Sequence, residues 1–80
     1  MAVRLVFLGK LADLAGVDER EIAAPLDWDG LLAALRGPVA EAVSAERTRI
    51  AINGALLADK AVLFANDGDE VALLPPVSGG

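Results

Sequence analysis

The chain contains no cysteine and no histidine among its 80 residues. Without cysteine it can form neither disulfide bonds nor thiolate metal sites, and it has no side-chain sulfur nucleophile. Without histidine it lacks the residue that most often acts as a general base near neutral pH. We therefore expect that the protein is not catalytic on its own and that partners supply any catalysis in which it takes part.

Basic residues are scarce, with 7 lysines and arginines against 12 acidic residues and a formal net charge of −5. Nucleic-acid binding depends on lysine and arginine to neutralise phosphates, so we expect no nucleic-acid partner and favour a basic protein partner. The carboxylates gather at residues 18–21 and 67–70, but their spacing does not match that of a hard-metal loop. We expect them to be solvated and predict no metal site.

Long apolar runs are also missing, because Arg4, Asp13 and Asp27 interrupt every candidate. None approaches the roughly 18 residues that a membrane helix needs. Residues 1–8 carry one positive charge but lack the long apolar stretch and the small-residue cleavage site of a signal peptide. We therefore expect a cytoplasmic protein of one domain that does not bind a membrane.

The first part of the chain has the pattern of a hairpin with a long loop. Residues 3–8 alternate between a strongly apolar and a mixed face, which predicts an interior strand. Residues 9–16 are predicted to be a turn, with Leu11 and Leu14 pointing inward. A weaker strand is predicted over residues 19–24.

Helical spacing follows. Asp27 is a candidate N-cap, and residues 28–35 place Trp28 and three leucines at i, i+3, i+4 and i+7. This pattern predicts one main helix, in which Trp28 packs at the core or its rim. Pro38 favours a second helical stretch that continues to about Glu46.

The last part returns to strands. Residues 49–52 and 55–57 are predicted strands, joined by Asn53-Gly54, a pair that tight reversals prefer. Residues 62–64 are predicted to form a buried turn. Residues 71–74 are a continuous apolar run, which is typical of a central strand covered on both faces.

This order of elements predicts an α+β protein of the β-grasp, or ubiquitin-like, class. We expect a mixed sheet of four to five strands packed on one main helix, with the first and last strands parallel at its middle. The predicted domain covers residues 1–74, and residues 75–80 are predicted to form a flexible C-terminal Gly-Gly tail.

The ending Pro75-Pro76-Val77-Ser78-Gly79-Gly80 points to a specific chemistry. A glycine pair can thread a narrow channel, and two prolines favour an extended exit from the domain. At about 3.1 Å per residue in the polyproline conformation, six residues reach roughly 19 Å. We therefore expect the Gly80 carboxylate to be the reactive group of the protein. The alternative is a frayed terminus without a function.

Essentially the whole chain resembles the small, sulfur-carrying subunits of molybdopterin synthase, in the ubiquitin-like sulfur-carrier superfamily. The resemblance rests on Phe7, Leu11, Asp13, Leu14 and Gly16, on Asn53-Gly54, on Gly68-Asp69-Glu70-Val71 and above all on the ending Leu74 to Gly80. Ala12 departs from the family's usual arginine, and residues 63–68 are longer than usual by a residue or two.

The resemblance implies a cycle in which an activating enzyme uses ATP to adenylate Gly80 and a sulfur-donor protein supplies sulfur for a thiocarboxylate. The large synthase subunit then uses this sulfur to build the molybdopterin dithiolene, in an expected heterotetramer of two large and two small subunits. It implies no permanently bound cofactor. The implied site consists of Gly80 as sulfur donor and of partner-binding residues Phe7, Leu74, Pro75, Pro76, Val77, Ser78 and Gly79.

Three alternatives remain open from the sequence. The chain could carry sulfur for another product, such as thiazole, cysteine or thiolated tRNA. It could be a ubiquitin-like modifier whose Gly80 forms an isopeptide bond with a target lysine. It could also be an interaction domain with an incidental tail.

Overall fold

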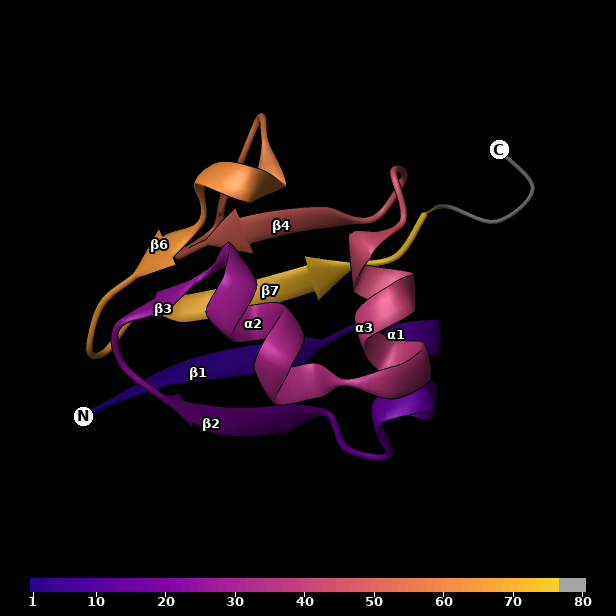
Figure 1. The fold of residues 1–80 in the computed structure, drawn as a ribbon, viewed down its shortest axis with the longest axis horizontal. Helices are drawn as coiled ribbons and strands as arrows, with labels where there is room; N and C mark the ends of the chain where they lie inside the picture. The colour runs from indigo at the N-terminus through magenta and orange to yellow at the C-terminus, as the bar shows by residue number, and fades with distance from the viewer. Residues whose placement is uncertain (77–80) are drawn as a thin grey trace.

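The computed structural model describes residues 1–76, in which a five-stranded sheet carries the helices on one of its faces (Figure 1). The elements are β1 (Ala2–Phe7), α1 (Lys10–Ala15), β2 (Glu19–Ala23), β3 (Leu26–Asp27), α2 (Trp28–Leu35), α3 (Gly37–Ser44), β4 (Arg49–Ile52), β5 (Ala55–Leu56), the 3-10 helix η1 (Lys60–Val62), β6 (Phe64–Ala65) and β7 (Glu70–Leu74). None of the helices in this described part is long and apolar enough to cross a membrane.

The sheet has the strand order β2-β1-β7-β4-β5, and β3 and β6 pair separately as a short ribbon. The first and last strands, β1 and β7, run parallel, whereas β2 and β4 are antiparallel to their neighbours β1 and β7. The predicted α+β, β-grasp class with parallel strands at the middle is therefore confirmed. The chain leaves the sheet from β7, a strand that is held by hydrogen bonds on both edges.

The helices α2 and α3 pack against each other on the sheet (Figure 1). Asp27 caps α2 as predicted, since its Oδ1 accepts a hydrogen bond from the backbone N–H of Gly30 at 2.8 Å. The predicted second helix also exists, but α3 runs from Gly37 to Ser44 and ends two residues early. Thr48 donates its hydroxyl to the carbonyl of Ala42 at 2.7 Å and so ties the loop after α3 back to that helix.

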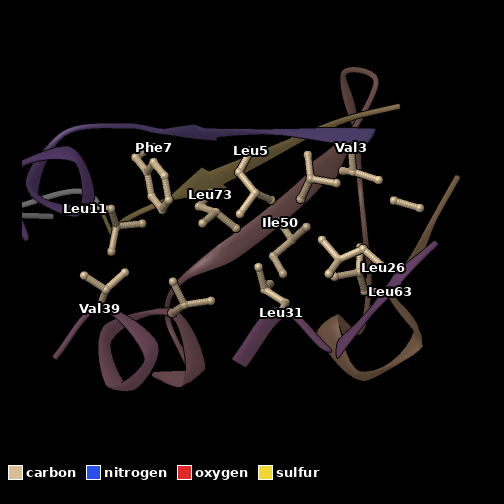
Figure 2. Packing of buried hydrophobic residues seen from close by; sticks show 13 residues of the cluster. Val3, Leu5, Phe7, Leu11, Leu26, Leu31, Val39, Ile50, Leu63 and Leu73 are labelled. Atoms are coloured by element: carbon tan, nitrogen blue, oxygen red, sulfur yellow. The ribbon is translucent and has the colours of Figure 1, made fainter. Parts of the chain in front are cut away.

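The core lies between the sheet and the helices, where the apolar side chains of both layers meet (Figure 2). It contains Val3, Leu5, Phe7, Leu11, Leu26, Leu31, Val39, Val43, Ile50, Leu63, Ala65, Val71 and Leu73. Burial of each large side chain stabilises the fold by about 1.5–3 kcal/mol. Trp28 is half-buried against this cluster, as expected, and its ring faces Lys60 Nζ at 5.6 Å.

Two loop predictions were wrong in part. Residues 9–16 contain the helix α1, which buries Leu11 but leaves Leu14 50% exposed. Of residues 62–64, only Leu63 is buried, whereas Val62 and Phe64 are 64% and 56% exposed. Successive side chains of the extended segment 63–65 point to opposite sides, so Phe64 turns outward between two buried neighbours.

The central strand β7 also differs from its prediction. Val71 and Leu73 are fully buried under the helices, but Ala72 and Leu74 on the other face are only half-buried. The continuous apolar run therefore does not reflect cover on both faces. It leaves apolar side chains on a face of the sheet that no element of the described chain covers.

Candidate functional site at the end of the central strand

The base of the C-terminal segment is fixed by the sheet. Leu74 ends β7 and lies opposite Arg49 of β4, and on the other edge the backbone N–H of Leu8 donates to the carbonyl of Leu73 at 3.3 Å. Pro75 is half-buried and Pro76 is exposed. The predicted site residues Val77, Ser78, Gly79 and Gly80 lie outside the described residues.

The face of the sheet opposite the helices, which we call the open face, carries an apolar strip. In the register of the sheet Ala72 is paired with Val6 on one side and with Ala51 on the other, and Ala51 is paired with Leu56. Leu74 is the next residue of β7 on the same face. The strip Val6, Ala51, Leu56, Ala72 and Leu74 thus crosses four strands and reaches the point where the chain leaves the sheet.

The strip is more accessible at its edges than at its centre. Ala51 is 6% exposed, whereas Leu56 is 65% exposed. Val6, Ala72 and Leu74 are half-buried. An apolar surface of this kind, at the point where the chain leaves the sheet, is typical of a protein-binding site.

Charged side chains border the strip at the end away from the C-terminal segment. Arg4 forms ion pairs with Glu19, at 3.7 Å, and with Glu70. The hydrogen bond to Glu70 and the charges of both glutamates raise the pKa of Arg4. Because these side chains are largely exposed, the pairs add little stability and leave a solvated charged border.

The predicted partner-binding residues fall into different environments. Phe7 is 2% exposed and points into the core, so it offers almost no surface to a partner, contrary to our expectation. Phe7 is buried because side chains alternate along β1, so that Phe7 faces the core and its neighbour Val6 faces the open side. Leu74, Pro75 and Pro76 lie at the site, and their contacts with a partner stay predictions.

Sequence reasoning missed Ala51, Leu56 and Ala72 as members of the strip. The available signal was the run at residues 71–74, since an apolar residue on the second face of a strand needs a cover or a partner. The register in which the strands pair cannot be read from the sequence, so these residues could not be assigned to one surface.

The acidic turn at residues 67–70 holds the fold together near the far end of β7. Asp69 accepts hydrogen bonds from the backbone N–H of Asn66 at 2.8 Å and from Asn53 Nδ2 at 3.1 Å, and both lower the pKa of Asp69. The Asn53 side chain in turn accepts from the backbone N–H of Glu70 at 2.9 Å. These contacts join the β4–β5 turn to the start of β7. In the described part of the chain no group of three acidic side chains could hold a metal ion.

A mixed sheet with parallel central strands, helices on one face and a chain that leaves from the central strand defines the ubiquitin-like β-grasp class. The sequence profile of the ThiS family matches residues 5–80. The chain therefore belongs to the ThiS family of ubiquitin-like sulfur carriers.

Solved structures with the same fold have names of two kinds. A chain in the complex of subunits 1 and 2 of molybdopterin-converting factor from Helicobacter pylori 26695 is 30% identical, with a TM-score of 0.67 and 100% of each chain covered. SAMP1 from Haloferax volcanii is 25% identical, with a TM-score of 0.73 and 100% of each chain covered. The small archaeal modifier protein 1 from Methanosarcina acetivorans is 25% identical, with a TM-score of 0.77 over 99% of this chain and 96% of that one. No curated protein sequence matches the chain significantly.

Proposed function

We propose that the protein carries sulfur for molybdopterin synthesis as the small subunit of molybdopterin synthase, with the carboxylate of Gly80 as the group that is modified. The observation that carries the proposal is that β7 delivers the C-terminal segment directly beside the apolar strip. Docking surface and reactive segment then form one site. The similarity to a chain of the Helicobacter pylori two-subunit complex supports this choice of pathway.

The proposal divides the chain into a β-grasp domain, residues 1–74, and a tail, residues 75–80. A terminal carboxyl has a pKa of about 3.3–3.7, so at neutral pH it is an anion and a poor electrophile. Attack of a carboxylate oxygen on the α-phosphorus of ATP releases pyrophosphate and forms an acyl adenylate. A persulfide of a donor protein then attacks the acyl carbon, expels AMP and forms an acyl disulfide. A second thiol of the donor cleaves the S–S bond, which releases the thiocarboxylate and leaves a disulfide on the donor.

The chain's own residues position this chemistry and do not catalyse it. The tail has no charged side chain from Pro75 onward, so the charge of ATP must be neutralised by cations of the activating enzyme. In the large synthase subunit the thiocarboxylate sulfur is transferred to the pyranopterin precursor, and water returns the acyl group to a carboxylate. We propose that Leu74 and the rest of the apolar strip bind that subunit in a heterotetramer of two large and two small subunits.

The test is intact-mass spectrometry of the full chain after incubation with an activating enzyme, ATP and a sulfur donor. We expect a mass gain equal to the replacement of one oxygen by sulfur, located at Gly80 by fragmentation. A variant lacking Gly80 should stay unmodified and remain folded, because the core cluster is built from residues 3–73. An unmodified wild-type protein, in a mixture that converts another sulfur carrier, would contradict the proposal.

The pathway needs its own test. Thiocarboxylated protein mixed with the large synthase subunit and the cyclic precursor should yield molybdopterin. Transfer to a thiazole, cysteine or tRNA-thiolation system instead, with no molybdopterin formed, would assign the carrier to that pathway.

The second candidate is a ubiquitin-like modifier, which the similarity to two SAMP1 structures favours. In this case a lysine amine attacks the adenylated Gly80 and forms an isopeptide bond with release of AMP. Tryptic peptides of cell proteins that carry a C-terminal remnant of this chain on lysine would support this function. Conjugates that disappear in the variant lacking Gly80 would establish it.

A further inference from the structure

We propose that Gly9 is a positioning residue for the tail, because its contact with Pro75 sets the direction in which the chain leaves the central strand. The effect of Gly9 on the reaction rests on the proposed function, whereas its proximity to Pro75 is a feature of the fold alone. A Cβ atom at residue 9 would lie 3.1 Å from Cγ of Pro75. Ordinary contacts of a Cβ lie at 3.4–4 Å, so the absence of a side chain lets the proline ring approach this closely.

The backbone of Gly9 gives an independent reason for glycine. Its φ of 54° with ψ of −129° belongs to a region that residues with a Cβ rarely adopt. This conformation turns the chain from the end of β1 into α1. The short distance to Pro75 and the positive φ therefore each favour glycine at residue 9.

Gly9 is held on both sides, so it acts as a rigid stop for the proline ring. Its neighbour Leu8 donates a hydrogen bond from its N–H to the carbonyl of Leu73, which keeps the ends of β1 and β7 together. The carbonyl of Gly9 accepts from the N–H of Ala12 at 3.1 Å, which anchors it to α1. Leu11 of the same helix is buried in the core.

Pro75 transmits the contact to the residues that follow. Its ring fixes φ, so it cannot swing away by rotation about that bond alone. A side chain at residue 9 must push the ring away from β1, and this rotates the start of the tail. The ring itself must give by a few tenths of an ångström. Since a misplacement of about 1 Å in a reacting complex can cost on the order of 100-fold in rate, we expect a smaller loss here.

The chain offers a second glycine with positive φ, at the other end of α1, as a control for a substitution that does not touch Pro75. Gly16 ends the same helix with φ of 78°, but a Cβ there would meet nothing within 4 Å. Gly16→Ala therefore introduces strain at a positive φ without touching Pro75. Gly9→Ala introduces backbone strain and also a Cβ atom that meets the Pro75 ring.

The first experiment uses the free full-length chain and does not depend on its function. In the wild-type protein we expect a nuclear Overhauser contact between the Gly9 α-protons and the Pro75 ring. Gly9→Ala should shift the amide resonances of Leu73 and Leu74 and change the contacts of the Pro75 ring, whereas Gly16→Ala should leave both unchanged. A Pro75 ring with the same contacts in wild type and Gly9→Ala would overturn the inference.

The second experiment is a double-mutant cycle on adenylation by the activating enzyme, followed by ATP–pyrophosphate exchange. We expect Gly9→Ala to lower kcat about tenfold with little change in KM, because the substitution alters the direction of the tail and leaves the rest of the domain surface unchanged. In the Pro75→Ala background, which removes Cγ, the same substitution should cost less than about twofold. Thermal melting of each variant confirms that it is folded at the assay temperature.

The outcomes separate this inference from the proposed function. If wild type is adenylated and Gly9→Ala matches it, or if Gly16→Ala loses as much kcat as Gly9→Ala, Gly9 does not position the tail. If wild type itself is not adenylated, the proposed function fails, and the resonance experiment on the free chain still decides whether Gly9 orients Pro75.

Discussion

Truncation of Leu56 tests whether the apolar strip binds the large synthase subunit. Leu56 is 65% exposed in β5, so a partner can bury about two thirds of its side chain. Full burial of a leucine is worth about 1.5–3 kcal/mol, and two thirds of this is about 1–2 kcal/mol. Leu56→Ala should therefore weaken the complex about 5- to 30-fold.

The same substitution should hardly affect folding, because an exposed side chain contributes little to the core. Val62 provides the control, since it is 64% exposed but lies in η1, away from the strip. Val62→Ala should leave binding unchanged. The dissociation constants can be measured by isothermal titration calorimetry with purified large subunit, and the free energy of unfolding by denaturant titration.

Two outcomes would refute the reasoning. Unchanged affinity of Leu56→Ala would exclude the β5 end of the strip from the interface. An equal loss in both variants would mean that exposed apolar area contributes without regard to its position, and the strip would then have no special role.

Other substitutions test the fold that supports the site. Leu31→Ala removes a fully buried side chain and should cost about 2–5 kcal/mol of unfolding free energy by denaturant titration; a loss below 1 kcal/mol would contradict the packing described. Asp27→Ala should cost about 1 kcal/mol through loss of the α2 cap, and Asp27→Asn should restore most of it. Asp69 has a lowered pKa, so its contribution to stability is present above the ordinary pKa near 3.8 and is lost as the pH falls through the folded-state value. The stability difference between wild type and Asp69→Asn should therefore shrink on acidification below about pH 3.8, and a constant difference down to pH 2 would contradict this role.

The strands that position the site were predictable because their patterns are local. Alternation in residues 3–8, the cap at Asp27 and the apolar run at residues 71–74 each specify an element without knowledge of its neighbours. Their order then admits few topologies, and the parallel pairing of β1 with β7 followed from it. The fold class could thus be derived from sequence.

The sides on which residues lie were harder to predict. The alternation in residues 3–8 sets Phe7 on the strongly apolar face and Val6 on the mixed face, but the family resemblance led us to place Phe7 at the interface, although it belongs to the core. The predictions for Leu14 and Phe64 were wrong for a different reason, because a helix or strand this short carries too little pattern to identify its covered side. The contact of Gly9 with Pro75 has no local signal, since only the pairing of β1 with β7 brings these residues together.

A docking strip next to the tail has an energetic advantage, because it offsets part of the entropy cost of ordering the tail. Ordering one backbone residue costs about 1–2 kcal/mol, so each tail residue that becomes fixed only in an active site adds about this cost, and less where proline already restricts φ. The tail carries few side chains that could offset this cost by burial, because its last two residues are glycines. In the proposed complex, docking of the strip makes insertion of the tail an intramolecular step and so raises its effective concentration at the active site. This gain depends on a fixed origin and direction of the tail, which β7 supplies through hydrogen bonds on both edges and Gly9 through its contact with Pro75.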